Sequence, residues 1–196
     1  MKILVVGSGG REHAIALKLK ENPKVEQIFA APGNGGMAAF CTPVNIKATD
    51  VEGMVAFAKE NGVDFAVVAP DDPLVLGMVD AMEEAGIPSF GPNKAAAIIE
   101  GSKVFSKNLM KKYGIPTAKY ETFASEKEAV AYLKAQNTYP TVVKADGLAL
   151  GKGVLIAKNE QEALDAVHSI MSDKIFGASG NHIVIEEFLE GPEGSV

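Results

Sequence analysis

Through the first half of the chain, short apolar runs typical of β-strands alternate with longer stretches in which apolar residues recur at helical spacing. Runs of β-branched and other apolar residues predict strands at 2–6, 27–31, 64–68 and 87–91. Apolar residues at helical spacing predict helices at 12–20, about 51–58 and 93–100. Strands that alternate with helices are typical of βαβ units, so the pattern predicts an α/β domain with an open parallel sheet and flanking helices.

The pattern changes around the Gly114-Ile115-Pro116 stretch, which ends the first of the helices given next. Helices are predicted at 102–113, 125–136 and 160–171, and strands at 141–143, 154–157 and 182–186. The predicted organisation is an N-terminal domain, a bridging helix with a linker, a small α+β subdomain and the beginning of a further subdomain, at 1–101, 102–120, 121–180 and 181–196.

Glycine-rich loops follow the first two predicted strands. Because the carboxyl ends of parallel strands meet at one crevice, we expect both loops to face one ligand, with the helix after the first loop offering free N–H groups to an anion. The candidate contacts are Ser8, Gly9, Gly10, Arg11, Asn34, Gly35 and Gly36. The third strand ends in Asp71 and Asp72, of which Asp71 is a candidate substrate contact. Asp72 is predicted to cap the next helix, with Pro73 at its first position.

A dinucleotide site is an alternative for these loops. The dinucleotide fingerprint, however, needs a third glycine where this chain has Glu12, and it needs an acid at the tip of the second strand. Pro32 to Gly36 stand at that tip instead. The sequence therefore favours a single small phosphate ester. His13 could contact that phosphate or pack against the sheet.

The stretch from Pro140 to Gly153 predicts a hairpin that suits a polyphosphate. Its tip combines two lysines with glycines, and an unshielded backbone next to ammonium groups binds phosphate oxygens well. The residues are Lys144, Gly147, Gly151, Lys152 and Gly153. A surface hairpin with solvated lysines is the alternative. Lys103 needs an anionic partner because a cation in the first turn opposes the helix dipole, whereas Lys107 and Lys111 are predicted to lie on a solvated face.

Composition excludes several classes of protein. The net charge of −6 and the pI of about 5.2 argue against a broad nucleic-acid-binding surface. Cys41 is the single cysteine, so an intrachain disulfide and a thiolate metal cluster are excluded, and a buried structural thiol in a cytoplasmic protein is predicted. His168 and His182 have no acid or cysteine at ligand spacing. No stretch is long enough to span a membrane.

Several motifs in register resemble the ATP-grasp enzymes and, within them, the phosphoribosylamine–glycine ligase family. They are Val6 to Ala14, Pro32 to Gly36, Phe90-Gly91-Pro92, Ser102-Lys103, Val143 to Val154 and Ile185 to Leu189. The resemblance covers the whole chain and implies a pre-ATP-grasp N-terminal domain followed by ATP-grasp subdomains, the second of them incomplete. It also implies ATP and Mg²⁺, with Mn²⁺ possible in its place.

The resemblance implies that ATP phosphorylates the carboxylate of glycine and that the amine of 5-phosphoribosylamine then displaces phosphate, giving glycinamide ribonucleotide and ADP. Lys103 and Lys144 match the lysines that contact the phosphates, and 147–153 match the loop over them. Glu186, Phe188 and Leu189 match the strand that reads adenine, and Glu193 matches the acid on the ribose. The N-terminal loops match the phosphoribosylamine side. Asp71 stands where the family has a glutamate, which leaves its substrate contact open.

The family extends well beyond Val196, so the resemblance implies a fragment without catalytic activity of its own. Its catalytic residues and magnesium ligands are expected after Val196, and none is expected within this chain. Two alternatives stay open: another ATP-grasp carboxylate–amine ligase, and a non-catalytic nucleotide-binding module. The expected partners are the three small-molecule substrates, with no nucleic acid and no membrane, in a monomer or a homodimer.

Overall fold

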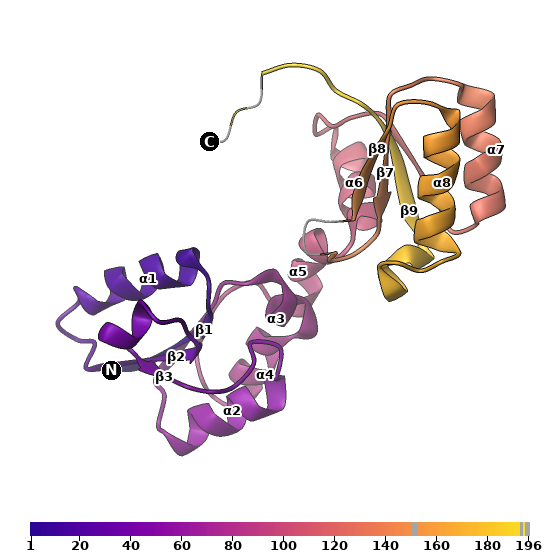
Figure 1. Ribbon diagram of the computed structural model, residues 1–196. Coiled ribbons are helices and arrows are strands. Elements are labelled where there is room, and N and C mark those ends of the chain that lie inside the picture. Colours follow the sequence, from indigo (N-terminus) through magenta and orange to yellow (C-terminus); the bar gives the residue numbers. More distant parts are fainter. Residues whose placement is uncertain (150–152, 193, 195–196) are drawn as a thin grey trace. The chain divides into compact units, whose positions relative to one another are not determined.

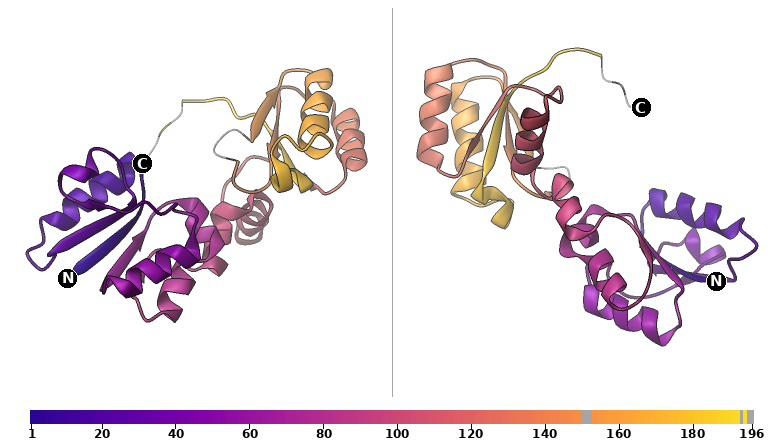
Figure 2. Two further views of the ribbon diagram at one scale, coloured as in Figure 1. Left: turned by 60° about the horizontal axis from the view of Figure 1, so that its bottom comes forward. Right: turned by 180° about the vertical axis from the view of Figure 1, so that it is seen from behind.

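The computed structural model describes residues 1–149, 153–192 and 194 (Figures 1 and 2). The chain divides into two compact units, Met1–Ile98 and Ile99–Val196. Each unit has its own sheet and its own core, so each is described by itself.

The first unit is built on a parallel sheet with the strand order β3-β2-β1-β4-β5. Its strands are β1 (Lys2–Gly7), β2 (Gln27–Pro32), β3 (Thr42–Pro43), β4 (Phe65–Val68) and β5 (Ser89–Phe90). Its helices are α1 (Gly10–Lys20), the short η1 (Met37–Ala39), α2 (Val51–Glu60), α3 (Asp71–Leu76) and α4 (Met78–Glu84), followed by α5 (Lys94–Gly101). The open parallel sheet predicted from the apolar pattern is confirmed.

Helices cover both faces of this sheet, as Figure 2 shows. Leu4 and Val6 point to the side of α2 and α4, whereas Ile3 and Val5 point to the side of α1. Successive strand side chains alternate between faces, so a strand buried on both sides becomes a continuous apolar run. The continuous apolar run of β1 therefore allowed this strand to be predicted from the sequence.

The first helix after β4 begins earlier than predicted. Pro70 is the N-cap of α3, and Asp71 and Asp72 both lie in its first turn, so the assignment of Asp72 as the cap is wrong. Pro73 is tolerated at the third helical position because the first N–H groups of a helix have no partner within it.

The second unit has an antiparallel sheet with the strand order β6-β9-β7-β8. Its strands are β6 (Tyr120–Phe123), β7 (Thr141–Ala145), β8 (Val154–Ala157) and β9 (Ile183–Glu187). Its helices are α6 (Lys103–Tyr113), α7 (Glu126–Gln136), α8 (Glu160–Met171) and the short η2 (Gly177–Asn181). Figure 1 shows α7 and α8 side by side on one face and α6 on the other. The predicted hairpin of β7 and β8 is confirmed, whereas β6 was not predicted.

The two faces of this second sheet differ in chemistry. Val143 and Ile185 pack with the predicted stripe of α8, which is buried at Ala163, Ala166, Val167 and Ile170. Because side chains alternate along a strand, Lys144 and Glu186 project from the opposite face. The site described below lies on that opposite face.

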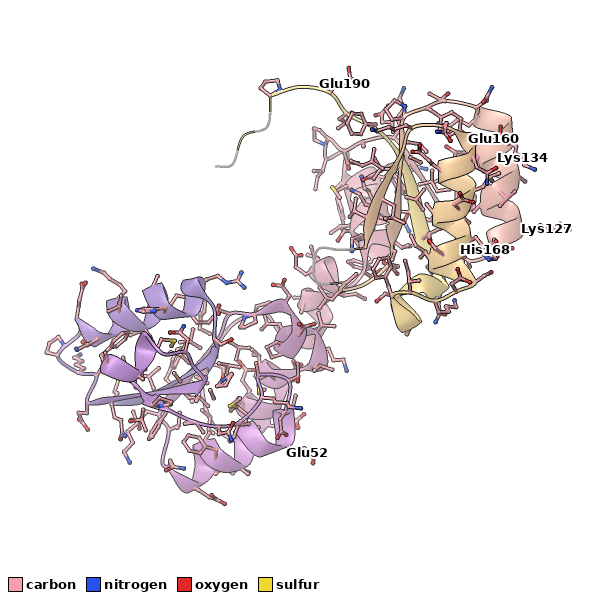
Figure 3. All side chains as sticks on the ribbon, viewed as in Figure 1. Glu52, Lys127, Lys134, Glu160, His168 and Glu190 are labelled. Atoms are coloured by element: carbon pink, nitrogen blue, oxygen red, sulfur yellow. The ribbon has the colours of Figure 1, made fainter. Side chains whose placement is uncertain are left out.

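A histidine joins the two helices on the covered face. His168 lies on α8 and is labelled in Figure 3. Its Nδ1 lies 2.9 Å from Glu126 Oε1 on α7, and Ser172 Oγ donates to the other oxygen of Glu126. The hydrogen bond to Glu126, with the charges of Asp173 and Asp165, raises the pKa of His168 above 6.5. The hydrogen bonds from Ser172 and His168 lower the pKa of Glu126 below 4.5.

We expect the His168–Glu126 pair to stabilise the second unit over a limited pH range. The histidine contribution is complete below pH 6.5 and is lost as the pH rises through the raised pKa, and the carboxylate contribution is lost as the pH falls below 4.5. His168→Gln should therefore lower the urea midpoint more at about pH 5.5 than at about pH 9. His182→Gln, at the other exposed histidine of this unit, is the control. Equal losses at both pH values would contradict the pairing.

Candidate functional site

The carboxylate of Asp146, directly after β7, caps α6. Ser102 is the N-cap of α6, and its hydroxyl accepts the Phe105 N–H. Asp146 Oδ1 accepts the Val104 N–H at 3.1 Å and also the Ser102 hydroxyl. The end of β7 is thereby fixed to the first turn of α6.

Lys103 is held against the beginning of the glycine loop. Its Nζ donates to the Gly147 carbonyl at 2.7 Å, so the partner of this cation is a backbone oxygen here. Gly147 has a φ of +84°, and an added Cβ would lie 2.9 Å from Ser179 Oγ. A side chain at this position would therefore be strained and crowded.

Asp146→Ala is expected to loosen this junction. The helix loses a cap, and the Ser102 hydroxyl loses its acceptor, so the free energy of unfolding of the second unit should fall by about 1 to 2 kcal/mol. Urea denaturation followed by circular dichroism measures the change. Asp165→Ala, at an exposed position of α8, is the control, and a similar small loss from both variants would contradict the role of Asp146.

Glu186 on β9 lies between two lysines. Lys144 Nζ contacts Oε1 and Lys107 Nζ contacts Oε2. The Lys107 ammonium also donates to Thr117 Oγ1 at 2.7 Å and lies 5.5 Å from the centre of the Tyr120 ring. The side chains of Lys107 and Glu186 are only 10% and 4% exposed. The prediction that Lys107 lies on a solvated face is wrong, because that side of α6 rests on β9.

Lys103 and Lys107 of α6, with Lys144 of β7, give this face an excess of positive charge. Burial lowers the pKa of Lys144, and the nearby charges of Lys107 and Lys103 lower it further. Burial also lowers the pKa of Lys107, while the charge of Glu187 raises it. Direct contact with the Glu186 carboxylate favours the charged form of both lysines. The buried Glu186 carboxylate thus faces more than one ammonium group, and an added anion would stabilise the charged form of these lysines.

Exposed apolar residues lie beside these charges. Val154 and Ile156 on β8 are 41% and 53% exposed, and they pair in register with Lys144 and Val142 of β7. They therefore project from the face that carries Lys144. An exposed apolar surface next to cations suits an aromatic base that is attached to phosphates. One signal of this surface is visible in the sequence, because β8 is apolar at every position and therefore on both of its faces.

The remaining residues that the motifs placed near ATP differ in their exposure, and three of them lie outside the described residues. Phe188 and Leu189 follow β9 and are exposed, as a segment that offers its backbone to a ligand must be. Gly153 is buried, and its carbonyl accepts the Ala145 N–H at 2.9 Å. Gly151, Lys152 and Glu193 lie outside the described residues.

In the first unit, the structure brings the two predicted loops together. Asn34 Nδ2 donates to the Ser8 carbonyl at 2.9 Å, and Asn34 Oδ1 accepts the Met37 N–H. Ser8, Gly9, Gly10, Arg11, Gly35 and Gly36 are exposed at this edge. His13 packs between the loops, where its ring lies 5.5 Å from Phe40 and where a Cβ on Gly36 would come within 2.5 Å of it.

Glu12 corrects one expectation about the helix that follows the first loop. Its carboxylate is buried, accepts the Gly9 N–H at 2.7 Å and contacts Arg11 Nε at 3.1 Å. The Gly9 N–H is therefore not free to bind an anion. The glutamate that replaces the third glycine of a dinucleotide loop occupies the space in front of this helix.

A pocket of about 500 Å³ lies next to Arg11. It is formed at the carboxyl ends of β4 and β5 and is lined by Arg11, Ile15, Leu74, Phe90, Gly91 and Pro92, among others. The Arg11 side chain is 62% exposed and uses Nε for its contact with Glu12. Asp71 is exposed at the start of α3 and does not line this pocket.

The described residues contain neither a metal-binding cluster nor a membrane-spanning helix. No group of three or more histidine, cysteine or acidic side chains there is arranged to hold a metal ion. None of the helices traced in the structure is both long enough and apolar enough to cross a membrane.

Comparison with known families places both units. The family described as phosphoribosylglycinamide synthetase, N domain, matches residues 1–100, and the phosphoribosylglycinamide synthetase ATP-grasp (A) domain matches residues 101–196. The chain belongs to the phosphoribosylglycinamide synthetase family. The resemblance inferred from the motifs is confirmed.

Relatives within the phosphoribosylglycinamide synthetase family are about half identical to this chain. The phosphoribosylamine–glycine ligase of Vibrio parahaemolyticus is 50% identical over 197 residues, which cover 100% of this chain and 46% of that protein. The enzyme of the same name from Allochromatium vinosum is 52% identical, with the same coverage. The chain therefore spans about half the length of the curated relatives it matches.

Solved structures agree with the ATP-grasp fold class. The phosphoribosylamine–glycine ligase of Thermotoga maritima has a TM-score of 0.78 and 30% identity, covering 98% of this chain and 45% of that one. The biotin carboxylase of Campylobacter jejuni, solved as a complex with β,γ-ATP, also has a TM-score of 0.78, at 17% identity over 96% of this chain and 45% of that one. The second likeness shows the fold alone, and the predicted fold class is confirmed.

Proposed function

We propose that this chain supplies the ATP phosphate-binding part and the phosphoribosylamine-binding part of a phosphoribosylamine–glycine ligase. The observation that carries the proposal is the buried carboxylate of Glu186 between Lys107 and Lys144, with the charge of Lys103 also close to Lys144. The names of the curated relatives support the reaction. The product would be glycinamide ribonucleotide, formed in the cytoplasm on the way to purines.

The phosphates of ATP fit the cationic face of the second unit. Lys103 and Lys144 would donate to phosphate oxygens, and loop residues 147–153, with Gly147, Gly151, Lys152 and Gly153, would cover them. Charge compensation supports this placement, because the ammonium groups outnumber the buried carboxylate between them.

The base and the sugar would lie along the same sheet. Val154 and Ile156 offer an apolar surface to adenine, and the exposed backbone at Phe188 and Leu189 offers hydrogen-bonding groups to its edge. Glu193 is proposed to accept from the ribose hydroxyls. Glu186, which the motif placed at this hinge, would contribute its backbone there, since its side chain is paired with lysines.

ATP would supply a phosphoryl group that converts the glycine carboxylate into a good acyl donor. The lysines of this chain would neutralise the charge on the phosphates and fix their position. Mg²⁺, or Mn²⁺ in its place, would supply further positive charge to offset the phosphates. The described residues contain no acidic cluster for such an ion, so its ligands are proposed to lie outside them.

The ribose phosphate of 5-phosphoribosylamine is proposed to bind at the joined loops of the first unit. Arg11 is its candidate charge partner, and the loop residues Ser8, Gly10, Asn34, Gly35 and Gly36 would donate around it. Gly9, whose N–H is bound by Glu12, would contribute only close approach of its backbone. The pocket next to Arg11 supports this proposal. Asp71 is the weaker candidate, because it lies outside that lining.

Titration with nucleotides tests the proposal. The chain should bind ATP with Mg²⁺ but not a nicotinamide dinucleotide, and the protein that contains it should release ADP only when glycine and 5-phosphoribosylamine are both present. Binding of the dinucleotide in preference to ATP would overturn the proposal. ADP release with another carboxylic acid in place of glycine would favour a different carboxylate–amine ligase.

A further inference from the structure

Lys107 has no part in the proposed phosphate contacts, yet it is the most buried of the three lysines. It reaches Glu186 from α6, four residues after Lys103. Thr117 and the Tyr120 ring surround the rest of its ammonium group. Burying an ammonium group costs free energy unless a nearby negative charge compensates it.

The geometry divides the two oxygens of Glu186 between two lysines. Oε1 contacts Lys144 and Oε2 contacts Lys107. Among the described side chains Lys107 is the one partner of Oε2, so the carboxylate keeps a counter-ion on one side whatever Lys144 does. Lys144 is also the more exposed lysine, at 25% against 10% for Lys107.

We propose that Lys107 is a positioning residue of the nucleotide site, which keeps Glu186 neutralised so that Lys144 can leave this carboxylate for a phosphate. The inference rests on the proposed phosphate site. Without Lys107, moving Lys144 to a phosphate would leave a buried carboxylate unpaired and next to an anion. Glu186 would then compete with the phosphate for Lys144.

The charged groups that face Lys144 make the proposal testable in the absence of nucleotide. In the part of the chain that the structure describes, these groups are Glu186 from β9 and Lys103 and Lys107 from α6. Removing Lys107 takes away a repelling charge and gives Glu186 wholly to Lys144, so the Lys144 pKa should rise. Replacing Glu186 as well removes the attracting charge, so the pKa should fall back.

The experiment compares the wild-type chain with Lys107→Gln, with the double variant Lys107→Gln/Glu186→Gln and with Lys111→Gln as the matched control on α6. Competitive amine labelling followed by mass spectrometry gives the pKa of Lys144. Calorimetric titration gives the affinity for Mg²⁺-ATP and for inorganic tripolyphosphate. Thermal melts establish that each variant is folded.

We expect Lys107→Gln to raise the Lys144 pKa and to weaken phosphate binding by about tenfold. The double variant should reverse the pKa change and recover most of the affinity, and Lys111→Gln should leave both unchanged. A merely structural role for Lys107 would make the double variant as weak as the single one or weaker, and that result would overturn the inference. So would unchanged pKa and affinity in Lys107→Gln.

Failure of the proposed function has a different signature. In that case the wild-type chain binds neither ATP nor tripolyphosphate, or binds them equally well after Lys144→Gln. The Lys144 titration then still decides whether Lys107 controls the pairing of Glu186 with Lys144.

Discussion

Lys144→Gln is expected to weaken ATP binding by about 10- to 100-fold, because a charged hydrogen bond to a phosphate contributes about 1.5 to 3 kcal/mol. Lys144 is the lysine that can exchange Glu186 for a phosphate oxygen, since its side chain keeps 25% of its surface exposed. Glutamine keeps a polar group of similar reach but carries no charge. Calorimetric titration of the chain with Mg²⁺-ATP measures the loss.

Lys158→Gln is the matched control for this variant. Lys158 follows β8 in the same unit and is exposed, so its replacement removes one positive charge without touching the cluster. Its effect should stay within the small range of screened surface charges. Equal losses from Lys144→Gln and Lys158→Gln would mean that net charge, and not this site, binds the phosphates.

Glu186→Gln should have the largest effect on stability. It leaves the buried ammonium of Lys107 without its counter-ion and removes the partner of Lys144. Breaking a buried ion pair from one side costs about 3 to 5 kcal/mol, so the second unit should unfold at a much lower urea concentration. Urea titration followed by circular dichroism measures the change.

The control for this variant is the neighbouring Glu187→Gln. Glu187 is half-buried, and its Oε1 accepts the Lys119 N–H at 2.9 Å, which a glutamine oxygen can still do. The loss should therefore be about 1 kcal/mol or less. Similar losses at the two positions would contradict the description of Glu186 as the shared partner of two lysines.

The elements of both sheets that are buried on one or both faces could be predicted from the sequence. The apolar runs of β1, β2 and β4 and the helical stripe of α8 carry their periodicity locally, so each is visible in a window of a few residues. β6 was missed because Tyr120 to Phe123 mixes polar and apolar residues at the edge of its sheet.

The residues that build the cationic face were harder to predict for a physical reason. Lys107 meets Glu186 and Asp146 meets Ser102 across long stretches of chain, and no local pattern encodes such pairs. A lysine on the polar side of a helix gives the same sequence pattern whether its side chain packs against a sheet or extends into solvent. The motifs located Lys103, Lys144 and Glu186, but they did not reveal that the Glu186 carboxylate is the partner of Lys144.

The contacts of Glu12 could not be predicted from the sequence either, although its partner is only three residues away. Its position in the glycine loop argued against a dinucleotide, yet the sequence did not reveal that its carboxylate turns back onto the Gly9 N–H. The loop residues were located correctly at the edge of the sheet. The helix N-terminus expected to be free there is partly occupied by the Glu12 carboxylate. Their contact with a substrate stays a prediction.

A crystal structure of the chain with a non-hydrolysable ATP analogue tests the central claim most directly. The account predicts phosphate oxygens within hydrogen-bonding distance of Lys103 and Lys144 Nζ, with Lys107 still on Glu186 and the base against Val154 and Ile156. A nucleotide bound elsewhere, for example at the Ser8 to Arg11 loop, with Lys144 unmoved from Glu186, would contradict it.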